Sequence, residues 1–171
     1  MSSVVDVVRT YLELRTPEQL RPAAAPPDVR FVRRDAIPLA DYRRLYRDVG
    51  ARWQWKDRTG WSDERLAAHL ARAEITVWEC LVGDASAGFF ELERHPEDDS
   101  VEISYFGLVE DFIGRGAGKA MLTRAAREAW AFAPVRVWLH TCTLDSPHAL
   151  PNYLARGFVA VRSEHYLVEI P

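Results

Sequence analysis

The chain has 171 residues, of which 48% are hydrophobic and 27% charged, and its formal net charge is −3. This is the composition of a soluble globular protein, and it carries no charge signature of nucleic-acid or membrane binding. The two cysteines, Cys80 and Cys142, form no disulfide framework, and no apolar run is long enough to span a membrane. Because no signal peptide is evident either, we expect one cytoplasmic domain over residues 1–171.

The first half of the chain predicts two strands followed by two helices. Residues 4–14 are rich in β-branched and aromatic side chains, and a Pro- and Ala-rich connection leads from this strand, within residues 1–27, to a second strand at 29–33. Apolar residues at helical spacing then predict helices over 38–50 and 63–73.

Residues 51–61, between the two helices, contain three tryptophans. They either cover the core or form the aromatic wall of a substrate pocket, since such pockets are mostly apolar with a few polar groups. If they form such a pocket, its residues are the following: Trp53, Trp55, Arg58 and Trp61.

The second half predicts a hairpin, a βαβ unit and a last helix and strand. The strands are expected at 75–82, 88–94, 100–108, 135–143 and 157–170, with a turn at 83–88 and a short helix at 148–156. Strands 100–108 and 135–143 should be parallel with a right-handed crossover. The fold class is therefore α/β (α+β): a mixed, mostly antiparallel sheet with one parallel pair and helices on both faces.

Strand alternation assigns the polar side chains to faces. Glu91 and Glu93 share one face, Ser104 shares a face with Glu102, and Tyr105 should point to the opposite side. His140 and Cys142 share a face, so a nucleophilic Cys/His pair there is an alternative. His69, His95 and His165 are scattered, and no metal-ligand spacing is visible, so we expect no metal.

A glycine-rich loop lies between the strand at 100–108 and the helix that follows. Gly114, Gly116 and Gly118 let the backbone approach a ligand, and the first N–H groups of the helix are unpaired. Arg115 and Lys119 add positive charge. This arrangement is typical of a phosphate site.

Two common phosphate motifs do not fit this loop. A P-loop would need glycine where Ile113 stands and Ser or Thr where Ala120 follows Lys119. A dinucleotide fingerprint counted from Gly114 would need its third glycine at Lys119.

A third motif does fit. Residues 113–122, IGRGAGKAML, align with R-G-x-G-x-G-x-A-L-L, with Ile113 in place of Arg or Gln. Residues 146–158 match N-x-x-A-x-x-x-Y-x-x-x-G-F at Ala149, Tyr153, Gly157 and Phe158, with Ser146 at the Asn position. Over roughly residues 100–158 the chain resembles the GNAT-type N-acetyltransferase superfamily.

The resemblance implies an acetyl-CoA-dependent N-acyltransferase that transfers an acetyl group to a primary amine of a small molecule or peptide, with no metal. Strands 100–108 and 135–143 would splay apart around the cofactor. The cofactor-binding residues it implies are Phe106, Gly107, Leu108, Ile113, Gly114, Arg115, Gly116, Ala117, Gly118, Lys119 and Ser146.

For catalysis the resemblance favours Glu102 as general base and Tyr153 as general acid. Glu91 and Glu93 are rival carboxylates on the acceptor side. Two other functions stay open: an inactive acyl-CoA-binding regulatory module, and transfer of another acyl group. The long aromatic last strand could also support a homodimer.

Overall fold

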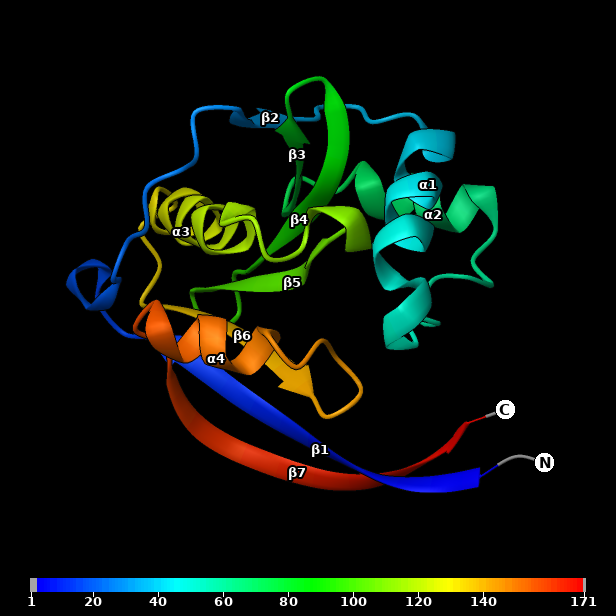
Figure 1. Cartoon of the computed structure of the whole chain (residues 1–171). Helices are drawn as coiled ribbons and strands as arrows, with labels where there is room; N and C mark the ends of the chain where they lie inside the picture. The colour runs from blue at the N-terminus through cyan, green and yellow to red at the C-terminus, as the bar shows by residue number, and fades with distance from the viewer. Residues whose placement is uncertain (1–2, 171) are drawn as a thin grey trace.

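The computed structural model describes residues 3–170 and contains one seven-stranded sheet in the order β2-β3-β4-β5-β6-β1-β7 (Figure 1). The strands are β1 (Ser3–Leu14), β2 (Val29–Arg33), β3 (Ile75–Val82), β4 (Ala85–His95), β5 (Ser100–Leu108), β6 (Arg136–Cys142) and β7 (Val159–Ile170). All neighbours are antiparallel except β5 and β6. The predicted fold class is therefore confirmed.

Four α-helices cover the two faces of this sheet: α1 (Leu39–Gly50), α2 (Asp63–Leu70), α3 (Ala117–Trp130) and α4 (Ala149–Ala155). In Figure 1, α3 lies on one side of strands β3 to β5, and α1 and α2 lie on the other. Within residues 3–170, no helix is both long and apolar enough to cross a membrane.

Successive side chains of β4 point to opposite faces of the sheet, and apolar residues occupy both faces. Phe89 packs in the cluster under α1 and α2, whereas Phe90 packs in the cluster under α3, and both are fully buried. Tyr42 and Leu45 complete the first cluster, and Met121 is buried in the second. Each fully buried side chain of this size contributes about 1.5–3 kcal/mol to stability.

Strand β1 lies between β6 and β7, a position that the sequence did not predict. It pairs with β6 only from Arg9 to Leu14, whereas its pairing with β7 runs from Ser3 to Glu13. The first part of β1 therefore forms a two-stranded ribbon with the last part of β7, as Figure 1 shows.

The parallel pair β5–β6 separates soon after it begins. Only three residue pairs hold it together, from Ser100–Arg136 to Glu102–Trp138, although β5 continues to Leu108. Beyond Glu102, the edge of β5 that faces β6 has no strand partner among residues 3–170. Its backbone N–H and C=O groups are therefore free to bond something else.

Two local predictions were wrong. The turn between β3 and β4 is only two residues long, because Val82 already pairs with Ala85. Tyr105 shares a face with Glu102, because β5 carries an extra residue: Tyr105 pairs with Glu91 and Ile103 with Leu92. This β-bulge at Ser104 interrupts the alternation that the prediction assumed.

Candidate active site

A cavity of about 680 Å3 opens where β5 and β6 separate. It is bounded by the end of β5, the end of β6, the glycine loop before α3, the loop after α1, and residues of α4 and β7. The absence of β5–β6 pairing beyond Glu102 is what creates the gap between the two strands.

The glycine loop forms one wall of this cavity. Gly114 and Gly116 have φ values of 85° and 86°, in the left-handed region that glycine adopts without strain. A Cβ added at Gly114 would meet no protein atom within 4 Å, so this side of the loop is open. Gly116 is the residue directly before α3, so the unpaired N–H groups of the helix begin at the cavity wall.

Most of the predicted cofactor residues line the cavity. The cavity is lined by the following members of the set: Phe106, Gly107, Leu108, Ile113, Gly114, Gly116, Gly118, Lys119 and Ser146. Two members of the set do not line the cavity. Ala117 is buried in the core under α3, and Arg115 packs on Phe112, with its guanidinium 5.5 Å from the ring centroid.

Gly107 is required by packing as well as by its place in the cavity wall. A Cβ at this position would lie 2.5 Å from Val49 Cγ1, because α1 packs directly against the end of β5. The backbone of β5 therefore stays uncovered on the cavity side while its other surface is tightly packed.

Tyr153, the predicted acid, reaches the cavity from α4. Its ring is 6% exposed and packs edge-on against Phe106, with ring centroids 6.0 Å apart. Burial raises the pKa of the Tyr153 phenol, and the nearby Asp145 carboxylate adds to the effect. The hydroxyl therefore keeps its proton at neutral pH.

His140 and Cys142 reach the cavity from the end of β6. The surrounding protein atoms of the cavity wall lower the pKa of His140 by desolvation, although the residue is partly open to solvent, and the Arg9 cation lowers it further. The imidazole is therefore neutral at pH 7 and can accept a proton. The turn after β6 is fixed by Asp145, whose carboxylate accepts hydrogen bonds from Thr141 Oγ1 (2.6 Å) and Cys142 N (2.8 Å).

The loop after α1 forms an aromatic wall. Trp53 and Trp55 line the cavity, and Trp55 packs edge-on against Tyr105 with centroids 5.1 Å apart. The Tyr105 hydroxyl donates to the Asp57 carboxylate at 3.1 Å, and both residues also line the cavity. Trp61 does not reach it and instead packs against His69 of α2.

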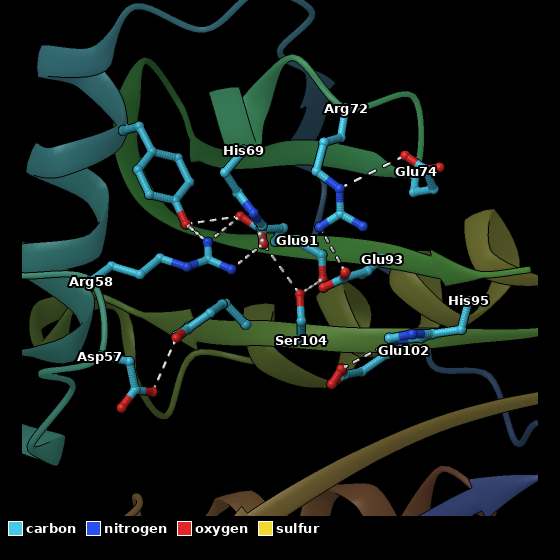
Figure 2. A network of polar contacts seen from close by, with 12 residues as sticks. Asp57, Arg58, His69, Arg72, Glu74, Glu91, Glu93, His95, Glu102 and Ser104 are labelled. Carbon is cyan, nitrogen blue, oxygen red and sulfur yellow. Dashed lines mark hydrogen bonds and ion pairs between the residues drawn. The ribbon is translucent and has the colours of Figure 1, made fainter. Parts of the chain in front are cut away.

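Arg58 and Glu91, predicted as substrate residues, are buried in a polar network beside the cavity (Figure 2). Glu91 is fully buried and accepts hydrogen bonds from Arg58, Tyr42 and Ser104, with His69 Nε2 3.1 Å away. Burial alone would raise the pKa of Glu91, but the bonds to His69 and Arg58 outweigh it and lower the pKa to about 2. Neither residue lines the cavity.

Glu93 and Glu102 also lie outside the cavity lining. They face each other across β4 and β5, and His95 Nε2 is 3.6 Å from Glu102 Oε2. Burial raises the pKa of Glu102 to about 6, although the neighbouring His95 acts in the opposite direction. On the same strand, the cavity lining begins at the next residue, Ile103, and continues with Ser104.

Several cavity residues had no signal in the sequence. Arg9 and Tyr166 are near the two ends of the chain and reach the cavity only because β1 and β7 lie next to β6. Asn152 sits beside the predicted Tyr153, and its amide donates to the Gly118 carbonyl at 3.3 Å, which ties α4 to the glycine loop.

Comparison with known structures places this architecture among acetyltransferases. An aminoglycoside acetyltransferase from an uncultured soil metagenomic sample, solved with sisomicin, is 16% identical, with a TM-score of 0.64 over 75% of this chain and 87% of that one. A GNAT-family acetyltransferase from Streptococcus pneumoniae is 20% identical, with a TM-score of 0.57 over 77% and 87% of the two chains.

Longer structures match almost the whole chain. A GCN5-related N-acetyltransferase from Kribbella flavida is 13% identical, with a TM-score of 0.65 over 99% of this chain and 60% of that one. A functionally unknown protein from Staphylococcus epidermidis is 17% identical, with a TM-score of 0.62, and this chain spans 62% of its length. A comparison with curated proteins found no match.

The family comparison agrees with the fold and with the loop. The model described as "Acetyltransferase (GNAT) family" matches residues 42–158. This range contains the glycine loop, the separating strands β5 and β6, and Tyr153. The chain therefore belongs to the GNAT acetyltransferase family.

Proposed function

We propose that the protein transfers an acetyl group from acetyl-CoA to a primary amine of a small molecule or peptide. One observation carries the proposal: the glycine loop, the start of α3 and the unpaired edge of β5 all meet in the cavity between β5 and β6.

The residues present suit the binding of coenzyme A. The open face of Gly114 and the first N–H groups of α3 suit a pyrophosphate, with Lys119 adding positive charge. The free backbone groups of Phe106 to Leu108 suit the amides of a pantetheine arm. Ile113 supplies no polar side chain, so recognition at that position relies on the backbone.

Two cavity residues suit the proton transfers of acyl transfer. The bound thioester would supply the acetyl group: a C–N bond forms, the C–S bond breaks, the amine loses a proton and the sulfur gains one. His140, neutral at pH 7, would accept the proton from the amine, and Tyr153 would donate one to the sulfur.

Glu102 remains a predicted base, but from its position it could accept the proton of the amine only indirectly. Its pKa of about 6 suits a general base, yet it does not line the cavity, so a water relay past Ser104 would be needed. His140 faces the cavity itself, and we therefore favour it.

The acceptor would enter beside the aromatic wall of Trp53 and Trp55, where Asp57 supplies a carboxylate for an ammonium group. A similar structure is an aminoglycoside acetyltransferase, which supports a small amine as acceptor. Trp61, Arg58 and Glu91 lie behind this wall, and their contribution would be to hold it. Glu93 bonds Arg72 instead and would not contact the acceptor.

Two measurements test the proposal. Acetyl-CoA should raise the thermal unfolding midpoint, and release of free thiol should depend on an amine from a panel that includes aminoglycosides and small peptides. Tyr153→Phe should lower kcat, because it removes the proposed acid.

The outcomes separate the alternatives. Stabilisation by acetyl-CoA without thiol release for any amine would indicate a binding module. Faster release from propionyl-CoA or succinyl-CoA would indicate a different acyl donor. Absence of any shift at millimolar acetyl-CoA would rule out the proposal.

A further inference from the structure

Glu93, His95 and Glu102 bring three potential metal ligands together on the sheet. One carboxylate oxygen from each glutamate and one ring nitrogen of His95 all lie within 4.8 Å of one another. Glu93 and Glu102 are directly paired across β4 and β5, and His95 follows two residues after Glu93 on the same face (Figure 2). The cluster is therefore fixed by backbone pairing and not by a loop.

His95 is oriented as a ligating histidine would be. Its Nδ1 lies 3.1 Å from Glu97 Oε1 and donates to this carboxylate, so the neutral form of the ring carries its lone pair on Nε2. Nε2 is buried and has no hydrogen-bond partner within residues 3–170, because Glu102 Oε2 at 3.6 Å is beyond hydrogen-bond distance. A histidine held by a carboxylate on its other nitrogen is the usual arrangement around bound metals.

A positive charge between the two carboxylates would stabilise the cluster. Like charges directly opposite each other on neighbouring strands destabilise the pairing. Arg72 donates to Glu93 Oε1 at 2.9 Å, which leaves the second oxygen of Glu93 free. Among the described residues, the only basic side chain within 4 Å of Glu102 is His95. A bound dication would compensate both carboxylates at once.

The donor set selects the class of ion. One imidazole nitrogen with two carboxylate oxygens suits divalent first-row metals such as Zn2+, Mn2+ and Co2+, whereas Mg2+ and Ca2+ prefer oxygen alone. The side chains of Glu93, His95 and Glu102 are 19%, 23% and 12% exposed, so water can complete the coordination. Trp138, with its ring centroid 5.6 Å from that of His95, covers one side of the imidazole.

We propose that Glu93, His95 and Glu102 form a binding site for a divalent first-row transition-metal ion, with Zn2+ as the leading candidate and Glu97 as the residue that orients His95. The ion would clamp β4 to the first residues of β5, at the level where β5 and β6 are still paired. The site is separate from the cavity and does not depend on the proposed acetyl transfer.

The test is calorimetric titration of ZnCl2 into the chelator-treated, untagged full chain, with Co2+ followed by its visible absorption. We expect one equivalent of Zn2+ to bind and to raise the unfolding midpoint, with no rise for Mg2+. His95→Gln should abolish binding. Glu97→Gln should weaken it by about 10- to 100-fold, because it removes only the orienting carboxylate.

Two control variants make the test specific to this cluster. His165→Gln removes another histidine that sits beside a carboxylate, Asp6 at 3.3 Å, and should leave Zn2+ binding unchanged. Cys142→Ser tests the other plausible ligand pair, Cys142 with His140 on β6. Loss of Zn2+ binding in Cys142→Ser, unchanged binding in a folded His95→Gln, or no binding by the native chain would each overturn the proposal.

Discussion

Arg58 and Glu91 are joined by two hydrogen bonds of 2.8 Å in a place where both side chains are almost completely buried. Arg58 follows Asp57 in the loop that forms the aromatic wall, and Glu91 belongs to β4 in the middle of the sheet. This ion pair therefore attaches a cavity wall to the core of the sheet, and the loop's position depends on a contact that lies outside the cavity.

Arg58→Met should lower the free energy of unfolding by about 3–5 kcal/mol. The substitution leaves the Glu91 carboxylate buried without its main cation, and an uncompensated buried charge is costly. Urea unfolding followed by circular dichroism measures the change.

The matched control is Arg33→Met, which breaks the exposed Arg33–Asp35 pair, where the side chains are 52% and 76% exposed. Exposed pairs contribute about 0–1 kcal/mol. Equal losses in the two variants would contradict the idea that the Arg58–Glu91 pair anchors the loop.

Gly114→Val should weaken acetyl-CoA binding far more than it weakens the fold. A Cβ at Gly114 meets no protein atom within 4 Å but projects into the loop's open face, and the positive φ adds strain of about 1–2 kcal/mol. Gly83→Val carries a similar strain in the β3–β4 turn, again with open space, but lies far from the cavity. Calorimetric titration with acetyl-CoA should separate them; similar affinities in both variants would argue against the glycine loop as the phosphate site.

Cys142 should react with maleimide in the folded protein, and acetyl-CoA should protect it. Cys142 lines the cavity, whereas Cys80 is fully buried and burial raises the pKa of its thiol to about 12. If only the free protein reacts, protection should reach about 100-fold at 100 times the dissociation constant. Mass spectrometry locates the label, and labelling of Cys142 that is unaffected by acetyl-CoA would place the donor elsewhere.

His140→Gln should lower kcat by about 10²–10⁴-fold if the imidazole is the general base. The imidazole must be unprotonated to accept a proton. Because the pKa of His140 is lowered, the native rate should fall only at pH values below about 6.5, the usual pKa of a histidine. The rate–pH profile of the variant should lose that acidic limb. Retention of the limb in His140→Gln, together with loss of turnover in Glu102→Gln, would favour the carboxylate as base.

The elements of this fold were predictable because hydrophobic periodicity and glycine or proline boundaries are local properties of the sequence. The order of strands and helices was predicted correctly, and the bounds of β2, β3 and β5 coincide with the predicted ones. Sheet order is not local: nothing in residues 4–14 indicates that this strand lies between β6 and β7.

The candidate site, like the fold, was predictable only where its residues are close together in the sequence. The glycine loop was visible because its residues are close together in the sequence: Ile113, Gly114, Gly116, Gly118 and Lys119 all line the cavity. Arg58 and Glu91 were assigned to the acceptor pocket because a sequence pattern does not show which charged residues find buried partners. The Glu93–His95–Glu102 cluster had no metal-ligand spacing, because its members come from two strands joined by antiparallel pairing.

The position of β1 also has a consequence for how the chain folds. Since Ser3 pairs with Ile170 and Leu14 with Val137, the strand formed by the first residues can acquire its partners only after the last part of the chain is available. Contacts so distant in sequence are slow to form and close a large loop. During synthesis β1 should therefore stay unpaired until β6 and β7 have been made. The part of the sheet formed by β6, β1 and β7, which completes the cavity, should be the last to assemble.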